Sequence, residues 1–488
     1  MLQVLWGLGG MVLVLAIAWL LSVDRRRINY RTIALALLIQ ITFGFLVLYV
    51  PAGRWVLEEF TGAVQAVINS SSAGIDFLFG PILPEDGSVF AFQVLPVIVF
   101  FASLTAVLYY VGALQLVTRW IGGGLAKVLG TTGPESMNAA ANIFVGQTKA
   151  PLVIRPYIKH MTPSEVFAVM AGGLTTVAGS VLVGYSLLGA NLEYLIAASF
   201  MAAPAGLLMA KMLVPAGALS DIGPNAVPTD ATTTTAQAPV VQAPDTVSGA
   251  DTPEVPRKAG GPKEDRSFAE RARAAFERGA RRGATVEGRD ELVRRVRAAD
   301  EPAAEADDEE DTVDEDEPVN VIDAASRGAS DGLGLALNVG AMLLAFISLV
   351  ALLNIIFGAI GSLFGVDDLS VQQILGYVFA PVMTAVGVPI NEAVDAGSFL
   401  GQKVVLNEFV AFSDFAPQAE EFSAKSQAII TFALTGFANL GSLAILLGGL
   451  GGIAPTQRGV IATLGLRAVL AGTLGNLMSA AIAGILIG

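Results

Sequence analysis

The chain has 488 residues, of which 53% are hydrophobic, and its mean hydropathy is +0.63. A soluble protein of this length is usually less apolar, and several apolar runs reach the roughly 20 residues with which a helix crosses a bilayer. The absence of cysteine excludes disulfides and thiolate metal sites, and the single histidine, His160, excludes a multi-histidine metal centre. The sequence therefore predicts an all-α polytopic membrane protein.

The net charge of −14 is concentrated between residues 221 and 323, where acidic residues far outnumber basic ones. An acidic, lysine-poor chain is typical of proteins that stay soluble at high salt, which suggests a halophilic source. A single acidic tract explains the same composition, so both interpretations stay open.

The first apolar run is expected to be a retained helix over residues 3–23, because it lacks a basic start and precedes the cluster Asp-Arg-Arg-Arg at 24–27. The positive-inside rule then places the N-terminus outside. Helices over 32–51 and 91–114 follow, joined by an outer connection over 53–90. The next segment, LVTRWIGGGLAKVLG, predicts an amphipathic helix on the inner surface.

Residues 136–159 are apolar but contain the helix-breaking run Gly-Gln-Thr-Lys-Ala-Pro. Inside-type charges follow this segment, so it predicts a re-entrant hairpin that enters and leaves the membrane on the inner side. Irregular backbone at that depth requires protein or a wet cavity around it. The next helix, over 164–188, is expected to break near Gly179 and Ser180, and a helix over 191–214 returns inside.

Residues 219–328 are first rich in proline, threonine and alanine, then in arginine, and finally in acidic residues. Such a composition cannot bury a core, so we expect a cytoplasmic, largely disordered insert. Its arginine-rich piece is expected either to lie on anionic lipid heads or to form a solvated helix.

A helix over 331–358, a second interrupted segment over 370–412, a helix over 425–450 interrupted at TGFANLGS and a last helix over 459–487 complete the chain. About eight transmembrane helices plus two re-entrant hairpins result, with the C-terminus outside. The predicted domains are N-terminal scaffold helices (1–115), a first repeat (116–218), the insert (219–328), a scaffold helix (329–369) and a second repeat (370–488).

The two halves repeat the same order of features. Gly146-Gln147-Thr148-Lys149 precedes a helix broken at Gly179, and Gly-Gln-Lys at 401–403 precedes a helix broken near Asn439. The first hairpin opens from inside and the second from outside. An inverted-topology repeat with two discontinuous helices is typical of a secondary transporter with a midplane site.

Polar side chains in these broken elements are expected to line a cavity, because polar groups facing lipid are costly. Glu408, flanked by apolar residues, is either an acceptor for substrate hydroxyls or a carboxylate paired with Lys403. Asn439 and Ser442 share a helix face and would bind a polyhydroxylated ligand or join two helices.

Another group of residues would suit a small hard cation. Asn142 and the main-chain oxygens near Val145 and Ser180 could surround it, since unwound carbonyls coordinate ions in transporters. His160 is expected at the inner surface rather than in a proton relay.

Four motifs in this order resemble the concentrative nucleoside transporter family: ANIFVGQTKAPLVIRPY, AGSVLVGY, AGSFLGQKVVLNEFVAF and TGFANLGSLAILLGGLGGIAP. The resemblance covers nearly the whole chain outside the insert. It implies a homotrimer in which a transport domain moves against a scaffold and carries nucleosides with a sodium or proton gradient.

The resemblance also implies the site residues. Substrate-binding residues would be Gln147, Thr148 and Lys149 at the nucleobase, and Glu408, Phe437, Asn439 and Ser442 at or near the ribose. Sodium, the only cofactor-like ion implied, would be held by Asn142, Val145, Ser180 and Val181.

Lys149 stands where the family usually has glutamate, and Leu440-Gly441 replaces the usual Phe-Ser before Ser442. Reversing a charge beside a cation site could cost several kcal/mol of sodium binding even at an effective dielectric near 20. Lys149 could pair with Glu408, replace the coupling cation, or recognise an anionic or modified substrate. It could also bend into the cytoplasmic vestibule.

The predicted function is import of nucleosides across the inner membrane by an alternating-access, elevator-like mechanism. The protein would not be an enzyme, since no nucleophile–base pair or metal cluster is visible, and it would bind no nucleic acid. One alternative is a membrane-anchored nucleoside-binding or regulatory protein whose insert signals to a partner. Others are a sodium-independent transporter and a channel, although two opposed hairpins favour alternating access.

Overall fold

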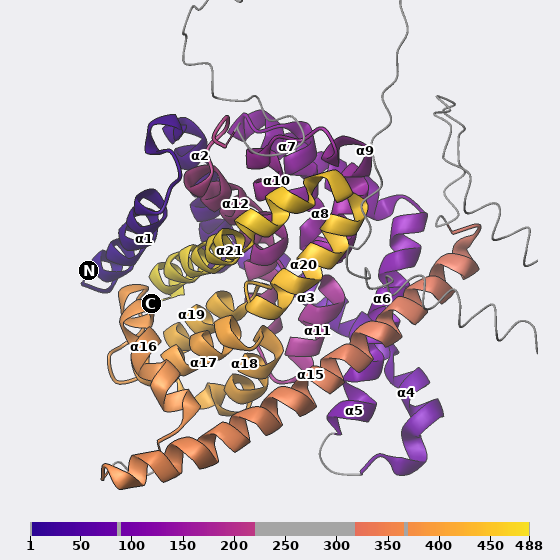
Figure 1. The fold of residues 1–488 in the computed structure, drawn as a ribbon. Coiled ribbons are helices and arrows are strands. Elements are labelled where there is room, and N and C mark those ends of the chain that lie inside the picture. The colour runs from indigo at the N-terminus through magenta and orange to yellow at the C-terminus, as the bar shows by residue number, and fades with distance from the viewer. Residues whose placement is uncertain (1, 85–88, 220–317, 366–368, 488) are drawn as a thin grey trace, which may run out of the picture. The chain divides into compact units, whose positions relative to one another are not determined.

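The computed structural model describes residues 2–84, 89–219, 318–365 and 369–487, which belong to one compact unit and are helical apart from turns and short connections (Figure 1). The expectations for residues 220–317, which include most of the insert, lie outside these ranges. The prediction of an all-α protein is confirmed for the described part of the chain.

The N-terminal part, up to residue 110, contains six α-helices among the described residues. They are α1 (Leu2–Leu20), α2 (Tyr30–Gly44, continued by a π-helical turn, Phe45–Tyr49), α3 (Pro51–Ser70), α4 (Ser72–Phe79), α5 (Phe90–Gln93) and α6 (Leu95–Tyr110). The connection expected over 53–90 is therefore mainly helical. Pro51 begins α3, where its fixed φ and missing N–H are tolerated.

The first repeat region has helices that are interrupted where the sequence predicts. It contains α7 (Ala113–Leu129), α8 (Gly133–Lys149), a 3₁₀ segment (Ala150–Ile154), α9 (Arg155–Ile158), α10 (Pro163–Thr175), α11 (Gly179–Leu187) and α12 (Leu192–Leu213). The break between α10 and α11 lies directly before Gly179, in agreement with the prediction.

The C-terminal part begins with the 43-residue helix α15 (Val321–Leu363). It continues with α16 (Val371–Ala385), α17 (Ala393–Val405), α18 (Glu408–Phe415), α19 (Ala424–Leu434), α20 (Leu440–Ile453) and α21 (Arg458–Ile487). Helix α15 begins well before the expected residue 331, because Asn320 caps it by accepting a hydrogen bond from the N–H of Asp323 (2.9 Å).

Six helical segments in the described part of the chain are long and apolar enough to cross a membrane. Two of them, Pro163–Leu187 and Leu192–Leu213, are about nine-tenths buried, whereas the apolar window of Val321–Leu363 is only 11% buried. The first two therefore form the interior, and α15 exposes most of its apolar surface.

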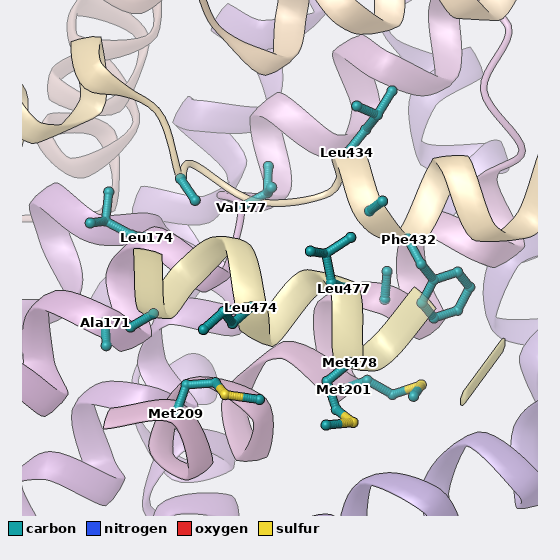
Figure 2. Close-up of a cluster of buried hydrophobic side chains, with 14 of the residues drawn as sticks. Ala171, Leu174, Val177, Met201, Met209, Phe432, Leu434, Leu474, Leu477 and Met478 are labelled. Atoms are coloured by element: carbon teal, nitrogen blue, oxygen red, sulfur yellow. The ribbon is translucent and has the colours of Figure 1, made fainter. Parts of the chain in front are cut away.

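The core lies where α21 meets the two interrupted helices. Figure 2 shows Leu474, Leu477 and Met478 of α21 among side chains of α10, α12 and α19. These three residues are at most 4% exposed. Tight packing here holds the two helix breaks at fixed positions, which is what a binding site between them requires.

Candidate functional site

The break in the first predicted hairpin depends on Gly146. This residue has φ +75° and ψ 177° inside α8, a conformation essentially restricted to glycine. A β-carbon at this position would lie 2.8 Å from the β-carbon of Ala178, in the break between α10 and α11. Gly146 thus ends the regular helix before Gln147 and lets the hairpin contact the neighbouring break.

The breaks of the two interrupted helices lie against each other. The N–H of Phe437, between α19 and α20, donates to the carbonyl of Thr176, between α10 and α11 (3.2 Å). The side chain of Asn476 on α21 joins both helix ends, since its Nδ2 donates to the carbonyls of Thr175 and Thr435 (2.7 Å each). We call this arrangement the helix crossing.

Lys403 of α17 completes the helix crossing from the other side. Its Nζ donates to the carbonyl of Ala433 (2.6 Å) and to Oδ1 of Asn476 (2.8 Å), and the side chain is fully buried. A cation near the carbonyl ends of helices is favourable. The alternative in which Lys403 pairs with Glu408 does not describe this structure, where the Lys403 ammonium donates to two neutral oxygens.

A cavity of about 810 Å³ lies next to the two breaks and is lined by Ala178 of the first break and Phe437 of the second. All seven predicted substrate-binding residues line it: Gln147, Thr148, Lys149, Glu408, Phe437, Asn439 and Ser442. Three of the four predicted sodium ligands, Val145, Ser180 and Val181, line it as well. Segments more than 250 positions apart in sequence thus share one cavity, of a volume typical of small-molecule sites.

Glu408 and Asn439 are held together in the wall of this cavity. Asn439 is the N-cap of α20: its Oδ1 accepts from the N–H of Ser442 (2.7 Å) and its Nδ2 donates to Oε2 of Glu408 (2.6 Å). Glu408 itself begins α18, which Asn407 caps through the N–H of Val410 (2.8 Å). Two helix N-termini therefore position one carboxylate in the cavity wall.

The residues predicted to hold sodium provide an oxygen of the right kind. Oδ1 of Asn142 is buried and has no hydrogen-bond partner in the described part of the chain, while its Nδ2 donates to the carbonyl of Asn138 (2.9 Å). A buried amide oxygen without a partner suits a hard cation. The Gly146–Ala178 contact brings the segment after Asn142 next to Ser180.

Lys149 has a partner that its local sequence does not indicate. Its Nζ lies 2.8 Å from Oδ2 of Asp331 on α15. Lys149 is therefore paired with Asp331 in this structure and not with Glu408. Both side chains line the cavity and are partly exposed. His160, in contrast, is exposed, as expected.

Comparisons with known proteins agree with this geometry. Three family models match: "Na+ dependent nucleoside transporter N-terminus" at residues 9–82, "Nucleoside recognition" (Gate) at 91–191 and "Na+ dependent nucleoside transporter C-terminus" at 292–484. The chain belongs to the Na+-dependent, or concentrative, nucleoside transporter family. The resemblance noted from the four motifs is thereby confirmed.

Members of this transporter family align along the whole chain. An uncharacterized transporter, YutK, of Bacillus subtilis is 46% identical, with 100% of both chains covered. The nucleoside permease NupC of Helicobacter pylori is 40% identical over 99% of this chain and 98% of its own.

Solved structures of a family member, CNTnw, match in more than one state. Its inward-facing, substrate-bound structure has a TM-score of 0.77 and 46% identity, with 99% of this chain and 98% of that chain covered. An outward-facing structure of a CNTnw variant has a TM-score of 0.78 and 45% identity, with 100% and 98% covered. The chain is thus an integral membrane protein of a transporter fold, and these relatives are transporters rather than enzymes.

The sequence-based prediction missed three residues, Asp331 and Asn338 in the cavity wall and Asn476 at the helix crossing. Asp331 and Asn338 lie seven positions apart, two turns along α15, and both line the cavity. Together with Leu335 they form a stripe of α15 that lines the cavity. Polar residues two turns apart in an apolar helix are a sequence signal from which this stripe could have been predicted. Asn476, in the last helix, gave no comparable signal.

Proposed function

We propose that this protein is a secondary active transporter that imports nucleosides by alternating access, coupled to the sodium gradient. The observation that carries the proposal is the single cavity lined by Glu408, held by Asn439, and by Gln147 and Thr148. A carboxylate accepts hydrogen bonds from ribose hydroxyls, and an amide and a hydroxyl can donate to and accept from a nucleobase. Membership of the family and its two solved states support the same conclusion.

In this mechanism each residue group has one task. Gln147, Thr148 and Lys149 would contact the base, and Glu408, Asn439 and Ser442 the ribose, with Phe437 beside it. Sodium, when bound by Asn142, Val145, Ser180 and Val181, would supply positive charge that orders the hairpin tip. The chain's own residues then bind and orient the nucleoside, and movement of the two hairpins with the interrupted helices exposes the cavity to either side.

The finer architecture belongs to the same proposal. About eight membrane-spanning helices and two re-entrant hairpins form an inverted repeat, with the domain boundaries given above. The termini face outward, and the 219–328 insert faces the cytoplasm of a cell whose inner membrane holds the protein. The halophilic source stays a prediction from composition.

A homotrimer is also proposed. The exposed apolar length of α15 supports it, because a window that is 11% buried requires lipid or neighbouring subunits to cover it. At about 65 Å, a 43-residue helix also exceeds the roughly 30 Å hydrocarbon core, so it has length to spare for such contacts.

Uptake into proteoliposomes tests the function. Vesicles containing the purified protein would receive labelled uridine or adenosine with an inward sodium gradient, with an equal potassium gradient, or with a proton gradient. We expect accumulation above equilibrium with sodium only. Accumulation without sodium would overturn sodium coupling and favour Lys149 as its substitute, and equilibration without accumulation would indicate a channel. Absence of uptake together with tight nucleoside binding would favour a binding or regulatory protein.

A further inference from the structure

The Lys149–Asp331 ion pair joins the tip of the first predicted hairpin to helix α15. The distance between Nζ and Oδ2 is 2.8 Å, and the side chains are 42% and 60% exposed, respectively. Lys149 ends the interrupted helix α8, while Asp331 lies in α15, 182 positions later.

Helix α15 is fixed to α6 by close backbone contact. A β-carbon at Gly332 would lie 2.7 Å from the β-carbon of Ala102, and one at Gly328 would lie 2.8 Å from the carbonyl oxygen of Ala102. The hydroxyl of Ser103 also donates to the carbonyl of Ala325 (2.8 Å). Figure 1 shows α15 running beside α6. Asp331 is therefore held by the α6–α15 pair.

The tip that carries Lys149 is fixed to the other part. Gly146 contacts Ala178, and a β-carbon at Gly173 of α10 would lie 2.9 Å from the β-carbon of Gln147. The tip is therefore packed against α10 and the α10–α11 break, whereas Asp331 is held beside α6. A movement of the interrupted helices past α15 has to separate the two charges.

The pair also sets the charge of the cavity wall. An uncompensated Lys149 would repel a cation held near Asn142 and Ser180, since like charges at one cavity repel each other more strongly in a medium of low dielectric than in water. Asp331 makes the pair neutral and leaves Glu408 as the remaining acid among the residues lining the cavity. Partly exposed ion pairs are weak, so this contact can open and close repeatedly.

We infer that Asp331 is the counter-ion that adapts this transport site to a lysine at position 149, and that the pair belongs to one conformation of the transport cycle. The inference rests on the proposed function, because it assumes that the hairpin moves past α15. Asp331 is a positioning residue, which acts on the cation and the nucleoside through Lys149.

Cross-linking tests the conformational part, and the chain offers a cysteine-free background. Cysteines would replace Lys149 and Asp331, and a bifunctional thiol reagent about as long as a lysine side chain would join them. We expect efficient cross-linking, at least tenfold lower uptake, and recovery when a cleavable reagent is reduced. The matched control joins Lys149→Cys to Asn338→Cys, two turns further along α15, and should cross-link several-fold more slowly.

Charge variants test the counter-ion part. Asp331→Asn leaves Lys149 uncompensated and should weaken sodium activation at least fivefold, measured as sodium-dependent thermal stabilisation and as the sodium dependence of uptake. The double variant Lys149→Gln/Asp331→Asn should recover most of that loss. Asp323→Asn is the matched control, because Asp323 pairs with Arg327 on α15 itself (3.1 Å) and should leave sodium activation unchanged.

Full uptake by the cross-linked protein, or equal sodium activation of Asp331→Asn and the double variant, would overturn the inference. Cross-linking rates and thermal stabilisation by sodium require no nucleoside uptake. Both measurements can therefore be interpreted even if the protein does not transport nucleosides. The counter-ion proposal and the proposed function can thus fail separately.

Discussion

Replacing Asn476 by alanine tests whether the helix crossing holds the transport site together. The substitution removes two hydrogen bonds donated to the carbonyls of Thr175 and Thr435. It also removes the Oδ1 that accepts from the buried Nζ of Lys403. Three buried polar groups lose a partner at the place where both interrupted helices end.

The magnitude follows from these three contacts. Hydrogen bonds between membrane helices average about 0.6 kcal/mol, so three contribute roughly 2 kcal/mol. Orphaned buried groups in soluble proteins cost about 1–3 kcal/mol each, which gives a higher figure. We expect a loss of about 2–4 kcal/mol, equivalent to an apparent melting temperature lower by roughly 2–5 °C in a protein of this size.

Melting of the detergent-purified protein, at one fixed heating rate, measures the stability, and calorimetric titration with uridine measures the affinity. Gln457→Ala is the matched control. Gln457 is also buried, and its Nε2 donates to two carbonyls, those of Ile158 (3.2 Å) and Met161 (2.9 Å), away from the helix breaks. Both variants should melt earlier, but only Asn476→Ala should weaken uridine binding, by about tenfold or more.

Two results would refute this reasoning. If Asn476→Ala melts like the unaltered protein, the crossing does not depend on the asparagine amide. If both variants lose uridine affinity equally, the loss reflects general destabilisation rather than displacement of the helix breaks.

Three further substitutions probe the site directly. Gly146→Ala should cost at least 1–3 kcal/mol, since alanine adopts φ +75° poorly and its β-carbon would meet Ala178; an unchanged melting temperature would contradict this. Glu408→Gln should lower uridine uptake at least a hundredfold with near-normal melting, because one hydrogen bond with Asn439 can persist; uptake within threefold of normal would exclude the carboxylate as a ribose acceptor. Asn142→Leu removes the buried oxygen without a partner and should raise the sodium concentration for half-maximal uptake at least tenfold, while unaltered sodium dependence would place the ion elsewhere.

The sequence predicted the interruptions well because they depend on local chemistry. Glycine and proline disfavour a continuous helix wherever the chain folds, so the breaks at Gly146 and before Gly179 could be located from residue type alone. The four motifs also pointed to one shared cavity, and all seven predicted substrate-binding residues line it.

Contacts between distant segments could not be predicted in the same way. A pair with Glu408 was one of several hypotheses for Lys149, but a flexible lysine pairs with whichever acid the fold brings within reach, and that acid is Asp331. Lys403 was considered a partner for Glu408, yet helix carbonyl ends and Asn476 satisfy it instead. The early start of α15 was missed because hydropathy marks the apolar part of a helix and not its polar first turns.

The stripe that α15 presents to the cavity has polar side chains at two levels, Asp331 and Asn338, about 10 Å apart along the helix, with Leu335 between them. A basic side chain that moves along this face would leave the carboxylate of Asp331, pass the apolar side chain of Leu335 and reach the neutral amide of Asn338. Such an alternation of polar and apolar residues favours two discrete positions of the basic side chain over a continuous range of positions. Stepwise movement would then be encoded in a helix that itself stays still.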